Sequence, residues 1–218
     1  MKRWCMTLAL LSAASANAAA PKLSPKQVVS NMQAAWRALP AYVCRMDAWS
    51  RKGSQEKTQA FNFSFQKPHL IRLKVLINPH KGADVVYRDG KIRAAERVLG
   101  IRVKTGMANT DPMFFDLRGA PFWQVDMGSQ IAAIQGLLPS SKASVARDGA
   151  AVTLTLKWRG ADKAAKDGVH AYVKTWKLDA KTWFPIERAT LQDGQKVEEV
   201  KAANIDLHAS LKDGDFNL

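Results

Sequence analysis

Residues 61–66 read Phe61-Asn62-Phe63-Ser64-Phe65-Gln66, with aromatic residues at alternate positions and polar residues between them. Successive side chains of a strand point to opposite faces, so this stretch predicts a strand with one buried aromatic face and one polar face. Segments 42–51 and 70–77 also have strand-like composition, and Gly53-Ser54 and Lys67-Pro68 mark the turns between the three. These residues predict the beginning of an antiparallel sheet.

Short strands separated by turn residues continue towards the C-terminus. The sequence Arg88-Asp89-Gly90-Lys91 is a strong hairpin signal between segments 83–87 and 92–97, and a short strand is expected at 101–104. The C-terminal third predicts strands at 143–147, 151–158, 169–178, 183–191 and 197–207, joined at Asp148-Gly149, Asp179-Ala180-Lys181 and Asp193-Gly194.

Two segments have helical periodicity. Ser24-Pro25 is suited to the N-cap and first turn of a helix whose apolar residues recur as far as Leu39, and a second amphipathic helix ends at Pro139. Residues 111–123 are apolar but follow neither period. The predicted fold is therefore mostly β, an open antiparallel half-barrel with about two helices covering its concave face.

The N-terminus has the organisation of a cleavable secretory signal. Lys2 and Arg3 precede an apolar stretch at 4–11 that is too short to span a bilayer, and Ala16-Asn17-Ala18 fits the cleavage site. We expect residues 1–18 to be removed and residues 19–218 to form a single soluble periplasmic domain.

The composition is strongly basic. The formal net charge is +14, and loss of Lys2 and Arg3 leaves 31 basic against 19 acidic residues, or +12. Such a charge favours anionic partners, which in an exported protein are membrane head groups or cell-wall polymers rather than nucleic acid. A solvated surface without a specific partner explains the charge equally well.

No set of residues has the spacing of a catalytic or metal site. The four histidines are unpaired in sequence, no nucleophile or Gly-rich phosphate motif is present, and Glu198-Glu199 should point to opposite faces of a strand. The single mature cysteine, Cys44, is expected to be a buried thiol. We therefore expect a protein that is not an enzyme and needs no cofactor.

Several segments together resemble the outer-membrane lipoprotein carrier superfamily (LolA/LolB-like). The resemblance is carried by residues 63–68, 69–76, the Asn78-Pro79 pair and residues 83–90. It continues with residues 176–179, Pro185, residues 203–207 and Phe216, and so covers most of the mature chain.

The resemblance implies a half-open barrel closed by helices around a hydrophobic cavity for acyl chains. Lysine replaces the family's functionally important arginine at Lys67, which we expect to act in head-group recognition or docking; the substitution keeps the charge but not the planar fork of donors. We expect the cavity to be lined by Trp36, Phe61, Phe63, Phe65, Leu73, Val75, Met113, Phe114 and Phe115, and residues 113–123 to form a mobile lid.

Two functions remain open at this point. The first is a periplasmic carrier or binding protein that shields the acyl chains of a lipid or lipoprotein. The second is a periplasmic regulatory or scaffold module that binds an envelope protein. A carrier should have an apolar cavity, whereas a partner-binding module should have a filled core and an exposed apolar patch.

Overall fold

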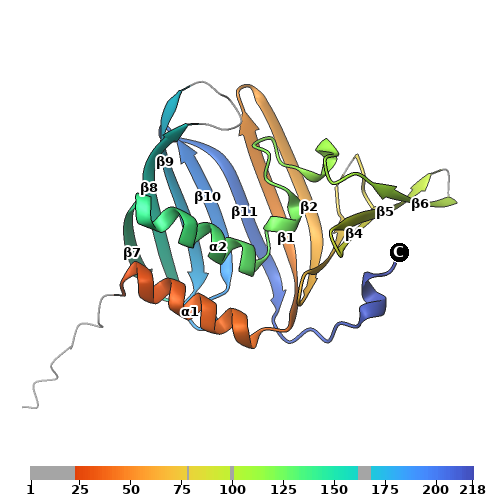
Figure 1. The fold of residues 1–218 in the computed structure, drawn as a ribbon, viewed down its shortest axis with the longest axis horizontal. Helices are drawn as coiled ribbons and strands as arrows, with labels where there is room; N and C mark the ends of the chain where they lie inside the picture. The colour runs from red at the N-terminus through yellow and green to blue at the C-terminus, as the bar shows by residue number, and fades with distance from the viewer. Residues whose placement is uncertain (1–22, 78, 99–100, 162–167) are drawn as a thin grey trace, which may run out of the picture.

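The computed structural model of the chain describes residues 23–77, 79–98, 101–161 and 168–218. It consists of one curved eleven-stranded antiparallel sheet with two α-helices on one face (Figure 1). The expected signal peptide lies outside the described residues. Within them, no helix combines the length and apolar character needed to cross a bilayer.

The first helix and six strands follow one another along the chain. Helix α1 (Pro25–Ala38) begins at the N-cap Ser24, whose hydroxyl accepts a hydrogen bond from the backbone of Gln27. The strands are β1 (Ala41–Lys52), β2 (Gln55–Gln66), β3 (Leu70–Val75), β4 (Asp84–Arg88), β5 (Lys91–Val98) and β6 (Ile101–Met107). From β2 onward, each strand pairs with the strand before it, so the six strands form a meander.

A second meander follows helix α2 (Met127–Leu137). Its strands are β7 (Lys142–Asp148), β8 (Ala151–Ala161), β9 (Val169–Asp179), β10 (Pro185–Gln192) and β11 (Gln195–Asp206). The last strand pairs with β1, so the spatial order is β6-β5-β4-β3-β2-β1-β11-β10-β9-β8-β7.

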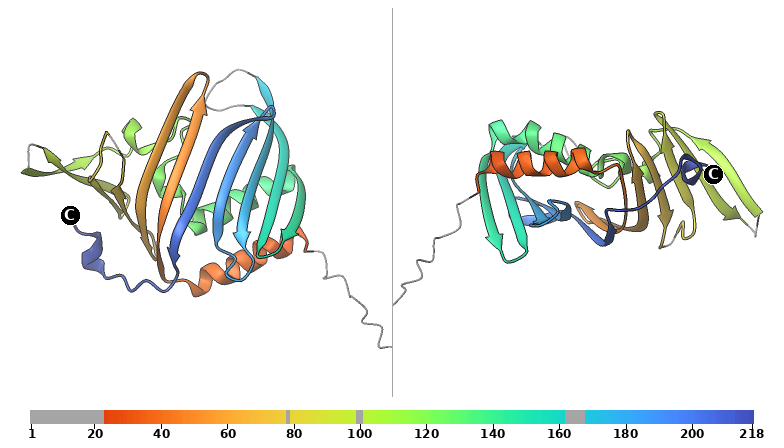
Figure 2. Two further views of the ribbon diagram at one scale, coloured as in Figure 1. Left: turned by 180° about the vertical axis from the view of Figure 1, so that it is seen from behind. Right: turned by 90° about the horizontal axis from the view of Figure 1, so that it is seen from below.

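This order forces the chain to cross the sheet once. Strand β6 lies at one edge and β7, which follows it in sequence, lies at the other. Residues 108–141 therefore run over the face of the sheet (Figure 1). Residues 108–126 form an irregular segment with short 3-10 turns, and α2 follows it. Helices α1 and α2 lie side by side over the second meander, on the same side as the irregular segment (Figure 2).

The concave face under these elements carries the main core. Phe63 and Phe65 of β2, Tyr42 of β1 and Trp176 of β9 are at most 1% exposed. The alternation in residues 61–66 is thus confirmed, because Phe61, Phe63 and Phe65 are buried while Asn62 between them is exposed.

The C-terminal segment covers part of the opposite, convex face. Phe216 is 2% exposed and packs against Leu70 of β3 and Val86 of β4, whose side chains alternate with those of the concave core. Arg72 donates a hydrogen bond to the Asp215 carbonyl at 2.8 Å. The sheet is therefore buried on both faces at β3 and β4.

The predicted elements are found with shifted ends, the largest of which is at β2: this strand begins at Gln55, well before the alternation at 61–66. The hairpin turns at Asp89-Gly90 and Asp193-Gly194 have positive φ at both residues, as type I′ turns require. Strand β3 ends at Val75 rather than at residue 77, and β10 starts at Pro185 rather than at residue 183. Trp183 has a φ of 59° and its backbone N–H donates to the Asp179 carbonyl, so it belongs to the preceding turn.

Candidate ligand-binding face

An apolar cavity of about 270 Å³ opens between β2, β3, β4 and the irregular segment. Five of the residues expected to line a cavity do so: Phe61, Leu73, Val75, Met113 and Phe114. Its other walls include Val85 and Phe122, and Lys57 and His80 are its charged or titratable lining groups within the described residues. The volume lies just below the roughly 300–1,000 Å³ of typical ligand pockets.

The irregular segment forms one wall of this cavity. Phe114 and Phe122 contact each other edge to face with centroids 5.7 Å apart, and both line the cavity. Phe115 does not line it but packs edge to face against Trp123 at 5.6 Å. Trp123 in turn stacks on Tyr87 of β4 at 5.4 Å.

Polar contacts attach this segment to the sheet. The ammonium of Lys57 donates to the Phe115 carbonyl at 2.6 Å, and the backbone N–H of Leu117 donates to the Ser50 hydroxyl at 3.1 Å. The guanidinium of Arg118 donates to the Gln192 side chain at 2.7 Å. These contacts involve individual side chains rather than a strand ladder, and the expected mobility of the segment remains a prediction.

Trp36, Phe63 and Phe65 occupy a different environment. Phe63 and Phe65 are at most 1% exposed and stack on Tyr42 with centroids 5.7 and 5.3 Å apart. Trp36 of α1 packs on Phe65 at 5.0 Å. These rings form the packed core beneath the helices, and a ligand would reach them only if α1 or α2 moved.

Lys67 holds the end of helix α1. Its ammonium donates to the carbonyls of Trp36 and Arg37, at 2.5 and 3.1 Å, and lies 4.7 Å from the centroid of the Trp36 ring. The C-terminus of a helix carries partial negative charge and leaves carbonyls without intrahelical partners, so a cation is stabilising there. Burial lowers the pKa of Lys67. Its contacts are thus structural, and a docking role remains a prediction.

The sequence pattern did not reveal a buried charged cluster on the concave face of the second meander. Glu198 of β11 accepts from the guanidinium of Arg188 at 2.6 Å, from the hydroxyl of Thr190 at 2.7 Å and from the ammonium of Lys174 at 3.2 Å. Burial opposes the charge on Glu198, but the two cations and the hydroxyl together hold its pKa well below the ordinary value.

The register of three strands creates this cluster. Thr190 of β10 lies opposite Lys174 of β9 on one side and Glu198 of β11 on the other. A signal was present in the sequence, since Lys174 occupies a position between Tyr172 and Trp176 in an otherwise apolar alternation. Glu198 and Glu199 have separate partners as expected, because Glu199 pairs instead with the surface residues Lys196 and Lys201.

The charged cluster lines a second cavity of about 650 Å³. Its roof is formed by α2 and by the end of the irregular segment, and its walls include the stacked rings of Trp158 and Tyr172, 5.1 Å apart. Asp116 also lines it and accepts hydrogen bonds from the backbone N–H groups of Arg118 and Ala120. Burial raises the pKa of Asp116.

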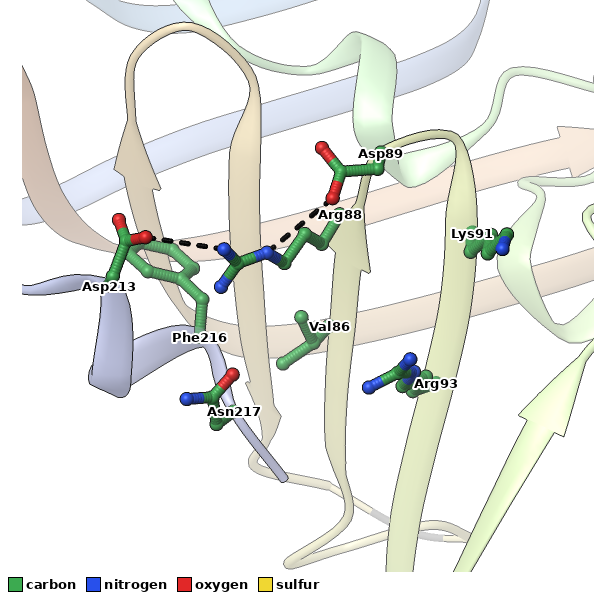
Figure 3. Close-up of a pocket in the computed structure, with 8 residues that line it drawn as sticks. All are labelled: Val86, Arg88, Asp89, Lys91, Arg93, Asp213, Phe216 and Asn217. Atoms are coloured by element: carbon green, nitrogen blue, oxygen red, sulfur yellow. Dashed lines mark hydrogen bonds and ion pairs between the residues drawn. The ribbon is translucent and has the colours of Figure 1, made fainter.

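A third pocket, of about 390 Å³, lies on the convex face beside the C-terminal segment (Figure 3). In this view the guanidinium of Arg88 lies between Asp213, at 3.2 Å, and Asp89, at 3.6 Å. The ion pair with Asp213 joins the C-terminal segment to β4. The pocket is therefore the seam between that segment and the sheet, and it is separate from the concave cavities.

Cys44 is 4% exposed as expected, and burial raises the pKa of its thiol to about 12. Across the described ranges, no three or more His, Cys, Asp or Glu side chains converge as metal ligands would.

Comparison with known proteins places the fold. No protein-family profile and no curated protein matches the sequence. The structure is similar to LprF from Mycobacterium bovis, with a TM-score of 0.52, 12% identity, and coverage of 88% of this chain and 99% of that one.

Two further solved structures are more distant. A LolA superfamily protein from Nitrosomonas europaea has a TM-score of 0.45 and 7% identity, over 90% of this chain and 98% of that one. The MucA/MucB complex from Pseudomonas aeruginosa has a TM-score of 0.49 and 14% identity, over 89% and 60%. At these identities the likeness concerns the fold alone: like LprF, the chain is an open half-barrel of antiparallel strands, with two helices across its concave face.

Proposed function

We propose that this chain is a periplasmic binding protein or carrier that shields the acyl chains of a lipid or lipoprotein on its concave face. The observation that carries the proposal is the apolar cavity between β2–β4 and the irregular segment. Burial of one methylene group is worth about 0.8 kcal/mol, so even a few carbons of a chain give a useful driving force. The expected signal peptide and basic charge support a site of action beside anionic membranes.

The cavity volume suggests how a longer chain would be accommodated. About 270 Å³ holds part of an acyl chain, and the irregular segment forms one wall. Displacement of Met113, Phe114 and Phe122 would enlarge the cavity and expose an apolar surface for the rest of the chain. Binding in this form shields the chain between the sheet and the segment.

The test residue must line the cavity without supporting the core. Phe63→Glu would place a carboxylate in a fully buried position and is expected to unfold the protein. Val75 is half-buried and lines the cavity, so Val75→Trp should fill it. The matched control is Asn62→Trp, on the exposed face of β2.

The first experiment is native mass spectrometry of protein purified from the periplasm, followed by organic extraction and titration with the fluorescent fatty acid cis-parinaric acid. A co-purifying acyl-bearing molecule, and a fatty-acid affinity about tenfold weaker in Val75→Trp but unchanged in Asn62→Trp, would support the proposal. If the wild-type protein carries no lipid and does not bind the probe, an acyl-binding role is excluded.

A second function is favoured by the open edge of the sheet. Ile101 and Val103 of β6 are 70% and 48% exposed, and edge strands readily pair with an added strand. A regulatory or scaffold module could bind an envelope protein partner there. Replacement of both residues by lysine should abolish capture of a membrane-anchored partner and leave fatty-acid binding intact. If the double variant still captures the partner, this edge is ruled out as the partner-binding site.

A further inference from the structure

The second cavity, of about 650 Å³, is the charged cavity: it is lined by three cations, Lys174, Arg188 and Arg118, and by two carboxylates, Glu198 and Asp116. Among the described residues, Glu198 is the only carboxylate in ion-pair contact with Lys174 or Arg188. The side chains of these two cations are 19% and 10% exposed. With Arg118 and Asp116 included, the described lining carries one more positive than negative charge, which favours the entry of an anion.

The two cations also have unused hydrogen-bonding capacity. The ammonium of Lys174 has three donors and makes one hydrogen bond, to Glu198, within the described residues. The Nε of Arg188 is buried without a hydrogen-bond partner. Because both residues line the 650 Å³ cavity, an anion entering it would meet the Lys174 ammonium, which has donors to spare, beside the Arg188 guanidinium.

The charged cavity adjoins the apolar cavity on the same face. A small void of about 30 Å³ lies between them and is lined by Phe114 and Phe122, which also line the apolar cavity. The same void is lined by Arg188 and Glu198, which also line the charged cavity. The two aromatic side chains thus separate an apolar compartment from a cationic one, and their displacement would join the two.

We propose that the charged cavity binds the phosphate of an amphipathic ligand whose acyl chain occupies the apolar cavity, with Lys174 and Arg188 as the contacting cations. This inference rests on the proposed function and adds the ligand class, an acyl-bearing phosphate ester. A phosphate has three peripheral oxygens, so cations from two adjacent strands can share it while Glu198 keeps its own hydrogen bonds. The small α2 residues Ala132 and Ala133 line the cavity and leave room for the group.

The test compares two amphiphiles with the same alkyl chain, dodecyl phosphate and the uncharged dodecyl dimethylamine oxide, together with inorganic phosphate. Affinities for the full mature chain are measured calorimetrically below the micelle concentrations. Lys174→Gln removes one cation and leaves Glu198 bonded to Arg188 and Thr190. It should weaken dodecyl phosphate binding by about ten- to hundredfold and leave the uncharged probe unaffected.

A steric variant keeps the test independent of the ion pairs. Ala133→Trp should fill the charged cavity from α2 and weaken dodecyl phosphate selectively, whereas Gln135→Trp, at an exposed position of the same helix, should not. If both amphiphiles bind with equal affinity and neither variant changes it, the phosphate site is overturned, while the proposed function still stands. Binding of inorganic phosphate without either amphiphile would overturn the lipid assignment and the proposed function. Binding of no probe would overturn both.

Discussion

At the scale of single residues, the least expected feature is a carboxylate kept ionised inside a sheet. Glu198 is 6% exposed, and it stays ionised because three donors form hydrogen bonds with its two carboxylate oxygens. Neighbouring Glu199 points to the other face and forms surface pairs with lysines. Adjacent residues of one type therefore have opposite environments, as the alternation of a strand requires.

We expect Glu198→Gln to lower the free energy of unfolding at neutral pH by about 3 kcal/mol, because it leaves Arg188 and Lys174 buried without the ion-pair partner that they share. The folded-state pKa of Glu198 lies below its ordinary value of 4.5, so its stabilisation is present above that pH and is lost as the pH falls below it. Urea unfolding across this range should show a weaker acid dependence in the variant.

Glu199→Gln is the control for this prediction, because surface pairs are worth at most about 1 kcal/mol. Equal losses of stability in the Glu198 and Glu199 variants would contradict the role of the buried cluster.

Lys67 provides the second prediction at this scale. Lys67→Ala removes a cation from the last carbonyls of α1 and should lower the free energy of unfolding by about 1–2 kcal/mol, while Lys67→Arg should retain most of the stability. Thermal unfolding measures both, with the exposed Lys74→Ala as reference. Normal stability combined with lost ligand binding would instead favour the docking role.

At the scale of elements, the irregular segment connects the two meanders and closes the concave face. Its backbone forms few hydrogen bonds with the sheet, and individual side chains such as Lys57 and Ser50 tether it. Its aromatic residues give it apolar contacts at the same time. We therefore predict that this segment, which a few tethers hold in place, opens without unfolding the domain.

Lys57→Met keeps most of the aliphatic side chain and removes the hydrogen bond to the Phe115 carbonyl. We expect amide hydrogen exchange in residues 113–117 to accelerate about tenfold. This factor corresponds to the free energy of a charge-assisted hydrogen bond at the weaker end of the usual range. Exchange in β8 and β9 should not change.

Lys52→Met, at an exposed position at the end of β1, controls for the loss of a surface charge. Unchanged exchange in the Lys57 variant would show that the apolar contacts alone hold the segment closed.

At the scale of the whole molecule, one sheet supports two opposed surfaces. The concave face carries the helices, the irregular segment and both concave cavities. The convex face of β3 and β4 is covered by the C-terminal segment (Figure 2). Stability contributed on the convex side should thus be separable from ligand binding on the concave side.

Phe216→Ala should lower the free energy of unfolding by about 3 kcal/mol, since it removes a buried ring from between Leu70 and Val86. The affinity of the folded protein for cis-parinaric acid should remain unchanged. Asn217→Ala, at the exposed neighbouring position, is the control for urea unfolding. If the fully folded Phe216→Ala protein binds cis-parinaric acid more weakly than the wild type, the two faces are coupled.

The sequence by itself determined the elements, because their signals are local. The alternation of Phe61, Phe63 and Phe65, the Asp-Gly turns and the Ser24 cap each depend on residues a few positions apart, and the antiparallel meanders followed from them. The position of Lys174 on a buried face was visible in the same pattern, although its partner was not.

Only the tertiary structure decided how the site is composed. Lys174, Arg188 and Glu198 meet because three strands align in register, and Phe114 and Phe122 lie between the cavities because the chain must cross from β6 to β7. Trp36, Phe63 and Phe65 have the same apolar character as Phe61 and Leu73, yet packing places the first three in the core beneath the helices and the other two at a cavity. Such outcomes depend on contacts between residues far apart in sequence, which hydrophobic periodicity does not specify.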